Sequence, residues 1–261
     1  MLFRKLRLDW RYGVSELVIV VAGVLIALYA DGWRQGRQDR ALELEYVQRL
    51  AEDIRLDTAE LSTMMASTEL WAEYAQAVIS TFDTGVRSQS PSDFVRVVEY
   101  GSFFAYPSYE RRTIDDLMST GNLRLIRSAS VKDAASRYYA EVDWTEQGRE
   151  LNRPVQLALI EVLPTFLSLE HRYALLDESR RGMCGRTLSC EGSIPWGPTE
   201  LDVSEEEADR VLQRLLSAPE ARALYANMAR VHGAHYANLA SIRQLATDAL
   251  SILQEYEAEF R

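Results

Sequence analysis

A run of uncharged, mostly apolar residues lies near the start of the sequence, bounded by Glu16 and Asp31. A helix over residues 12–33 would be about 33 Å long at 1.5 Å per residue, close to the thickness of one bilayer hydrocarbon core. Tyr12 and Trp33 would then lie at the two membrane interfaces, where aromatic side chains are enriched. The run therefore predicts one transmembrane helix over residues 12–33, with the rest of the chain forming a domain on one side of the bilayer.

A cleaved signal peptide is the alternative interpretation of this segment, because its N-terminal flank is basic and its apolar stretch is short. Cleavage sites carry small residues at positions −3 and −1. With Ala30 at position −1, position −3 would be Leu28, and with Ala27 at −1 it would be Leu25, so neither site has the small pair. An uncleaved anchor is therefore favoured. The flank before the helix holds four bases and one acid, and the flank after it holds three bases and two acids, which predicts a cytoplasmic tail over residues 1–11.

Cys184 and Cys190 are the only two cysteines, and they lie six positions apart in a glycine-rich loop at residues 182–203. Such a pair can close a small structural disulfide, which the oxidising bacterial periplasm would preserve. Two reduced thiols are the alternative. With the flanking charges, the pair predicts a single-pass protein of the bacterial inner membrane whose large domain is periplasmic. A loop this long is often functional, although a disulfide-tied connector is the simpler interpretation.

Charge is distributed unevenly along the 261 residues, whose net charge is −10. Residues 1–40 hold seven bases and four acids, whereas the remainder holds 22 bases and 35 acids. The basic end suits the anionic headgroups of a lipid bilayer. The acidic remainder would repel nucleic acid. The sequence thus predicts the lipid bilayer as a partner and excludes DNA and RNA.

Apolar residues at three-to-four spacing among good helix formers dominate the chain beyond the membrane segment. Residues 34–82 are predicted to form a stalk and the first bundle helix, continuous with the membrane helix, with Gly32 and Gly36 as the favoured hinge. Its buried face is expected to carry Leu42, Tyr46, Leu50, Ile54 and Leu61. Strand-like alternation is absent, which predicts an all-α fold: one N-terminal transmembrane helix continuing into a helical stalk and a helical-bundle soluble domain, with residues 83–261 forming its remainder.

Capping residues and prolines mark the expected helix boundaries. Pro154 and Pro164 should kink or break the helical run between about residues 131 and 176. Gly121 is typical of a helix C-terminus, and a final amphipathic helix is predicted over residues 219–260. Capping boxes predict further helix starts at Ser90, Ser130, Ser204 and Ser217.

The sequence lacks the motifs of common enzyme classes, namely a phosphate loop, a dinucleotide fingerprint, a nucleophile elbow and a zinc-protease helix. We therefore predict a protein that is not an enzyme and has no cofactor. His232 and His235 are a weak metal-site candidate, because their spacing puts both rings on one helix face, but two ligands do not make a site. His171 is expected at the surface.

An aromatic stretch is followed by Arg111 and Arg112, and this combination could line a ligand pocket. Packing in the core is the favoured interpretation. The aromatic residues are Tyr100, Phe103, Phe104, Tyr106 and Tyr109.

One face of the predicted membrane helix carries small residues between an acid and a base. At 100° per residue, five side chains lie within about 40° of one line: Glu16, Gly23, Ala27, Ala30 and Arg34. Small residues let membrane helices approach closely, and an acid within the membrane usually faces protein or water. This face predicts packing against a second copy of the chain or a partner subunit. A lipid-facing anchor, with Glu16 reaching toward the interface, is the alternative.

Two sequence blocks stand out. The first consists of Glu16 to Leu28, Trp33, Glu45-Tyr46, Leu50 and Asp53. The second consists of Thr113 to Ile126 and Tyr138-Tyr139, and its most distinctive residues are Ser119, Gly121, Asn122, Leu123, Leu125 and Ile126. Over about residues 4–140 the chain resembles a bacterial family of small single-span membrane proteins classed only as a domain of unknown function. The resemblance implies a single span with a helical domain, and it brings no catalytic residues.

These features predict a non-enzymatic interaction or scaffold protein that forms a homo-oligomer or joins a membrane-protein partner through its transmembrane helix. A periplasmic ligand-binding or sensory domain that acts through a partner is one alternative. An oligomeric ion-conducting pore with Glu16 in the membrane is another, because rings of acids favour cations.

Overall fold

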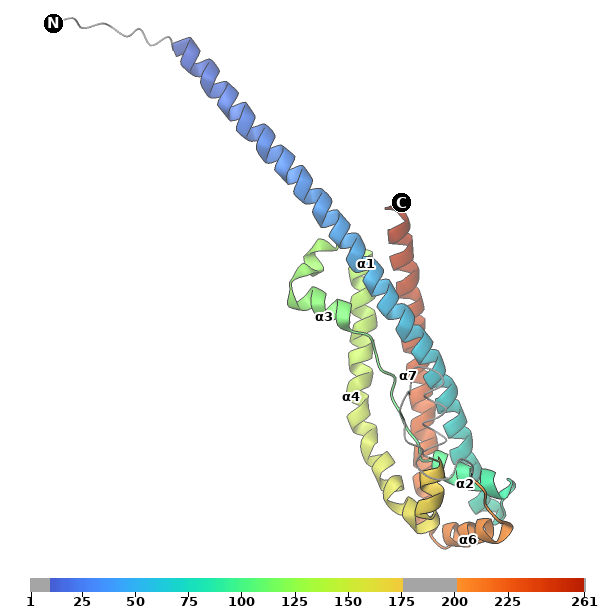
Figure 1. The fold of residues 1–261 in the computed structure, drawn as a ribbon. Helices are drawn as coiled ribbons and strands as arrows, with labels where there is room; N and C mark the ends of the chain where they lie inside the picture. Colours follow the sequence, from blue (N-terminus) through green and yellow to red (C-terminus); the bar gives the residue numbers. More distant parts are fainter. Residues whose placement is uncertain (1–9, 176–200, 261) are drawn as a thin grey trace, which may run out of the picture.

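The computed structural model describes residues 10–175 and 201–260, drawn in colour in Figure 1. Every regular element within those ranges is a helix, and no strand occurs there. The all-α prediction is therefore confirmed for the described part of the chain. Cys184 and Cys190, and most of the predicted loop at 182–203, lie outside these ranges.

Helix α1 (Trp10–Thr84) has 75 residues and runs without a break from the apolar segment to the far end of the bundle. Its length is about 110 Å at 1.5 Å per residue. The hinge predicted at Gly32 and Gly36 is not present, because both residues lie within the continuous helix. A single helical glycine costs only about 1 kcal/mol relative to alanine, which the helix on both sides can absorb. The first half of α1 projects out of the bundle, as Figure 1 shows.

The bundle is built around α7 (Pro219–Ala258), which packs along the second half of α1 and also against α4 (Ala129–Phe166). Residues 103–111 form an extended segment that contacts both other long helices (Figure 1). On one side the Glu110 N–H donates to Asp57 of α1, and on the other Gln156 of α4 donates to the Phe104 carbonyl. The segment therefore fills the space between α1 and α4.

Short helices cover the two ends of the bundle. The proximal end, next to the apolar half of α1, carries α3 (Arg112–Ser119) and the 3-10 helix η1 (Asn122–Leu125). The distal end carries α2 (Pro91–Tyr100) and α6 (Glu205–Leu216). Gly101 follows α2 and lies against the α1 backbone: a Cβ atom at this position would lie 3.0 Å from the backbone nitrogen of Ala75.

The predicted helix boundaries are right in part. Ser90 and Ser204 cap α2 and α6 as expected, each accepting a backbone N–H three residues ahead. The start predicted at Ser130 is wrong: Ser128 is the cap of α4, because its hydroxyl accepts the Val131 N–H. Ser217 instead ends α6, and α7 begins after Ala218 without a side-chain cap.

The two prolines have different outcomes. Pro154 lies inside α4 and does not break it, whereas the helix ends at Phe166, two residues after Pro164. Figure 1 shows α4 bending along this half. A kink is the ordinary response of a helix to an interior proline, because the ring removes one hydrogen bond and crowds the preceding turn.

The interior divides into two clusters of buried apolar side chains. The proximal core joins α1, α3, α4 and α7, and includes Tyr46, Val47, Leu50, Ile54, Leu61, Leu117, Ile126, Tyr138, Leu239 and Ile242. The distal core joins α1, α2, α4, α6 and α7, and includes Val78, Phe94, Val98, Leu159, Leu163, Phe166, Val211, Leu215, Tyr225 and Met228. Leu201 and Val203, at the end of the predicted loop, are buried in the distal core.

Candidate functional sites

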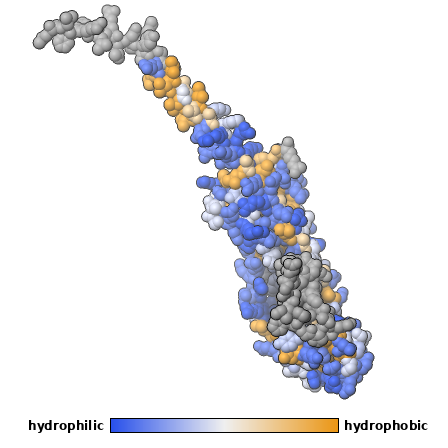
Figure 2. Space-filling model, viewed as in Figure 1, coloured by the Kyte–Doolittle hydropathy of each residue, from blue (hydrophilic) through white to orange (hydrophobic). Residues whose placement is uncertain are grey.

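The apolar half of α1 is long and apolar enough to cross a membrane, and no residue of its most apolar 18-residue window is buried. Figure 2 shows this apolar surface as an orange band between the grey N-terminal residues and the hydrophilic start of the bundle. Water would surround every side of such a helix outside a membrane, at a cost proportional to its apolar area. Among the described residues nothing covers this segment, which makes it the first candidate for function.

The predicted small-residue face lies on this exposed segment. A Cβ atom added at Gly23 would meet no atom outside its own helix within 4 Å, so a larger side chain would fit the isolated chain freely. Ala27 and Ala30 are exposed as well. At the end of the face, the Arg34 guanidinium lies 2.8 Å from Asp31. The role of this face in helix packing stays a prediction.

Three carboxylates of α1 are buried beneath the proximal short helices. Asp53 belongs to the first sequence block, whereas the sequence analysis did not single out the other two. Asp53 accepts the Thr113 N–H at 3.1 Å and so caps α3, whose own N-cap residue supplies no side-chain hydrogen bond. Asp57 accepts the Glu110 N–H at 2.7 Å and the Tyr138 hydroxyl at 2.6 Å. Burial raises the pKa of Asp57 to about 6, although both hydrogen bonds oppose the rise.

Glu43 is the third carboxylate, and it holds the chain where η1 leads into α4. Its Oε1 accepts the Arg127 N–H at 2.5 Å and the Tyr256 hydroxyl at 2.8 Å. Leu42, expected on the buried face of α1, is exposed instead, and Glu43 is fully buried. Together the three acids fasten residues 110–127 to α1 through backbone N–H groups.

The two sequence blocks that carry the family resemblance meet in this network. Asn122 donates to the Tyr46 hydroxyl at 3.0 Å, and Tyr138 and Thr113 bond to acids of α1. Gly121 has a φ of +70°, which explains why glycine ends α3 there. Of the remaining motif residues, Ile126 is buried, Leu123 and Leu125 are half-buried, and Ser119 is exposed. These residues therefore shape a turn and dock it on α1.

His232 and His235 are buried among aromatic rings. The His232 ring centre lies 6.2 Å from Trp71 and 5.5 Å from Phe104, and that of His235 lies 4.8 Å from both Phe104 and Tyr106. Burial lowers the pKa of both imidazoles to about 4. Both nitrogens of His232 lack hydrogen-bond partners. Across the described residues no three His, Cys, Asp or Glu side chains form a group that could hold a metal, so carboxylates do not complete this pair.

His171 was expected at the surface but is buried, with its Nε2 3.5 Å from the Glu207 carboxylate. The burial of His171 could not be predicted from its neighbours in sequence. The acid that faces its ring is Glu207 of α6, which is distant in sequence, and not the adjacent Glu170.

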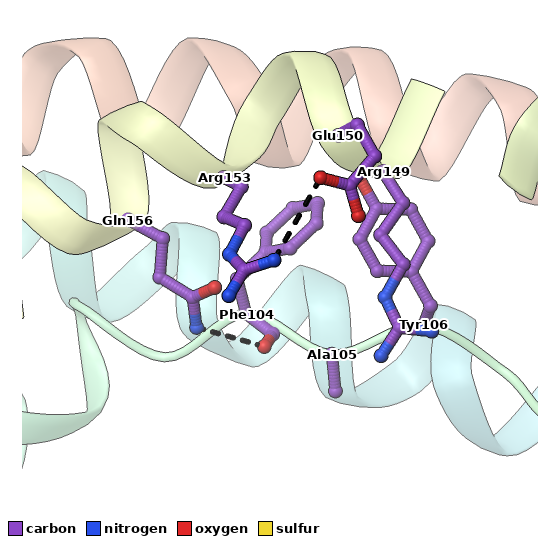
Figure 3. Close-up of a pocket in the computed structure, with 7 residues that line it drawn as sticks. All are labelled: Phe104, Ala105, Tyr106, Arg149, Glu150, Arg153 and Gln156. Carbon is purple, nitrogen blue, oxygen red and sulfur yellow. Dashed lines mark hydrogen bonds and ion pairs between the residues drawn. The ribbon is translucent and has the colours of Figure 1, made fainter. Parts of the chain in front are cut away.

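A surface cavity of about 390 Å³ lies between α4 and residues 104–106, as Figure 3 shows. Arg149 and Arg153 extend over it from successive turns of α4. The Arg149 guanidinium carbon is 5.4 Å from the centre of the Tyr106 ring, and Arg153 lies 3.7 Å from Glu150. Of the predicted aromatic stretch, Phe104 packs in the core and lines this cavity together with Tyr106. Arg111 and Arg112, the arginines considered with the stretch, are not among the residues that line it.

Comparison with protein-family models, with curated proteins and with solved structures finds no match to this chain. The family resemblance stays a prediction, and functional inference has to start from the sites themselves.

Proposed function

We propose that this protein is a membrane-anchored, non-enzymatic scaffold, in which the apolar half of α1 spans the bilayer and the bundle is held on one side. The exposed apolar surface of α1 is the observation that carries the proposal. A bilayer would cover that surface, and a helix satisfies its own backbone hydrogen bonds in hydrocarbon. As in the sequence analysis, the bacterial inner membrane is the proposed location, with the N-terminus cytoplasmic and the bundle periplasmic.

The continuity of α1 supports a scaffold role. The same helix forms the apolar segment and one wall of both cores, so a movement of the segment is passed directly to the bundle. The proximal carboxylates add to this coupling, because their hydrogen bonds engage the chain beside the point where α1 leaves the bundle. Such an arrangement suits a protein that positions a domain at a membrane.

Association through the small-residue face is the second part of the proposal. Gly23→Leu should block close approach of a neighbouring helix and abolish the cross-linked complex of the full chain in membranes. Gly32→Leu is the matched control, because residue 32 lies about 160° from Glu16 on the helical wheel and also has open space around it. Equal cross-linking of both variants and the unaltered chain would contradict association through this face.

The side of the membrane on which the bundle lies can be tested separately. A reporter enzyme that needs disulfides, fused after residue 261, should be active in the periplasm, whereas a fusion at the N-terminus should not be. The opposite pattern would reverse the proposed orientation and leave the anchor itself unaffected.

The cavity of Figure 3 supports a second candidate function, a ligand-binding domain that acts through a partner. Two arginines and one acid, Glu150, line the cavity, which leaves one net positive charge over an aromatic floor and suits a small organic anion. The cavity volume is within the range of ligand sites, about 300–1,000 Å³. A small dicarboxylate or phosphate ester should then raise the melting temperature of the protein, and Arg149→Gln should remove the effect. Arg137→Gln, an exposed position on the same helix, is the control. No shift with any small anion would count against this function.

A further inference from the structure

A second cavity, of about 610 Å³, lies at the proximal end of the bundle, where α1 emerges toward the apolar segment. Trp33 and Phe260 contribute aromatic walls, and Arg37, Arg40 and Arg127 contribute guanidinium groups. We call these five residues the arginine cleft. Because α1 meets there the residues just after α7 and just before α4, the cleft is formed only in the folded chain.

Two of the three arginines of the cleft, Arg37 and Arg40, contact aromatic rings rather than acids. The Arg37 guanidinium carbon lies 5.0 Å from the centre of the Trp33 ring, and that of Arg40 lies 5.2 Å from the centre of Phe260. Neither arginine has a carboxylate within 4 Å among the residues that the structure describes. Cation–π contacts orient a guanidinium without neutralising it, so both remain available to an anion.

Three acids of the described residues lie near the cleft: Glu43, Glu255 and Glu259. Glu43 is fully buried, lies 3.8 Å from the Nε of Arg127, and has its Oε1 bonded to the Arg127 N–H and to Tyr256. Glu255 and Glu259 line a neighbouring cavity, which shares Arg40 and Arg127 with the cleft. The described residues that line the cleft itself include three arginines and no acid, so its lining is positively charged.

The position of the cleft matches the headgroup layer of a bilayer, given the membrane span of the proposed function. Arg37 and Arg40 lie about 6 and 10 Å beyond Trp33 along the helix axis. The headgroup layer adds roughly 5–8 Å to each side of a hydrocarbon core about 30 Å thick. With Trp33 at the boundary of the hydrocarbon core, the backbone of Arg37 falls within the headgroup layer and that of Arg40 lies just beyond it, within reach of the long arginine side chain.

We propose that the arginine cleft binds the headgroup of an anionic phospholipid, with the lipid phosphate between Arg37 and Arg40 and the acyl chains along the apolar face of α1. The occupant is a lipid rather than a free phosphate because the cleft combines cations with exposed aromatic and aliphatic surface and adjoins the apolar segment. Planar guanidinium groups pair with phosphate oxygens through two parallel hydrogen bonds. The bound lipid would fix the height of the bundle above the membrane.

Native mass spectrometry of the full chain, released from nanodiscs of mixed phosphatidylglycerol and phosphatidylcholine, tests this inference. The unaltered chain should retain phosphatidylglycerol in preference to phosphatidylcholine. In the double variant Arg37→Gln/Arg40→Gln, the ratio of retained phosphatidylglycerol to retained phosphatidylcholine should fall by roughly thirtyfold. Each arginine near an anionic surface contributes roughly fivefold to the affinity. Arg55→Gln, an exposed arginine of α1 outside the cleft that pairs with Glu52, should behave like the unaltered chain.

Three results would overturn the inference. Equal retention of the two lipids by the unaltered chain would exclude a headgroup site, and undiminished preference in the double variant would place any site elsewhere. Binding of inorganic phosphate or glycerol phosphate to the detergent-solubilised chain, with no lipid retained, would make the ligand a soluble anion. A chain that does not enter nanodiscs at all would instead overturn the proposed membrane anchor, so the two failures are distinguishable.

Discussion

The two halves of the bundle differ at two particular sets of buried polar groups, the acids of α1 in the proximal half and the histidines of α7 in the distal half. In the proximal core, Asp53 and Asp57 accept hydrogen bonds from backbone N–H groups, and Asp57 also accepts one from a tyrosine. In the distal half, His232 has no hydrogen bond to either nitrogen and lies against aromatic rings. A buried polar group that is bonded specifies a unique arrangement, whereas one without partners only costs free energy.

This difference matches the positions of the two cores. The proximal core lies where α1 leaves the bundle for the proposed membrane segment, and its hydrogen bonds fix residues 110–127 on α1. The distal core is closed by the short helices α2 and α6, and Gly101 brings the end of α2 close to the α1 backbone. We therefore expect the proximal end to be sensitive to loss of hydrogen bonds and the distal end to be sensitive to volume and to protonation.

The largest effect is expected at the proximal end. Asp57→Ala leaves the Glu110 N–H and the Tyr138 hydroxyl without their partner and should lower the free energy of unfolding by about 3 kcal/mol. Chemical denaturation of the detergent-solubilised chain measures this loss. Glu52→Ala, which removes an exposed acid one turn away, should change stability by less than about 0.5 kcal/mol. Equal losses of stability in the two variants would contradict a stabilising role for the hydrogen bonds of Asp57.

A smaller loss is expected from added volume at the distal end. Gly101→Ala places a methyl group 3.0 Å from the Ala75 backbone nitrogen and should destabilise the chain by about 2 kcal/mol. Gly233→Ala is the matched control, because nothing lies within 4 Å of its added Cβ, and it should be neutral or stabilising by about 0.5–1 kcal/mol. A tolerated Gly101→Ala would show that α2 does not pack on α1 as closely as described.

The pH dependence of stability separates the two ends further. Burial lowers the pKa of His232 and His235 from 6.5 to about 4. Between pH 6.5 and pH 4 the two imidazoles are therefore protonated in the unfolded chain but neutral in the folded chain. Each histidine should therefore destabilise the fold by about 1.4 kcal/mol per unit as pH falls from 6.5 toward 4. Asp57, whose pKa rises from 3.8 to about 6, has the opposite effect: the folded chain binds the proton first, and stability rises as pH falls through 6.

The smallest change in stability at neutral pH is expected for His232→Phe, because the imidazole of His232 makes no hydrogen bond that the substitution would remove. Stability at pH 7.5 should change by less than about 1 kcal/mol, while the pH slope below 6.5 should become shallower by about 1.4 kcal/mol per unit. Denaturation midpoints measured across this range give the slope. His235→Phe should flatten the slope equally but cost more at neutral pH, since His235 bonds to the Ala105 backbone. An unchanged slope would mean that His232 is not buried as described.

Much of the helical architecture could be predicted from the sequence because its signals are local. The caps at Ser90 and Ser204, the glycine at 121 and the long periodic patterns of α1 and α7 are each readable within a few turns. The hinge predicted at Gly32 and Gly36 failed because a weak local preference was outweighed by the helix on both sides. Pro154 is a stronger helix breaker, and α4 accommodates it within a bent half of the helix, the kink that the sequence analysis gave as one of two outcomes.

The polar sites could not be predicted because their partners are distant in sequence. Glu43 and Asp57 continue the seven-residue spacing of Leu50, yet acids in such positions are normally assigned to solvent. The backbone N–H groups that they bind lie 84 and 53 residues away. An acid on the apolar face of a predicted helix was the one available signal. The same limit applies to His171, whose acidic neighbour comes from α6.

The central claim, that the apolar half of α1 spans a bilayer, is tested most directly by flotation of the full chain after alkaline extraction of membranes. The account predicts that the chain remains in the membrane fraction and floats with the lipid, and that Val20→Arg/Leu25→Arg weakens this retention because charge in the hydrocarbon core is costly. Release of the unaltered chain into the soluble fraction would contradict the anchor, and with it the proposed scaffold at a membrane.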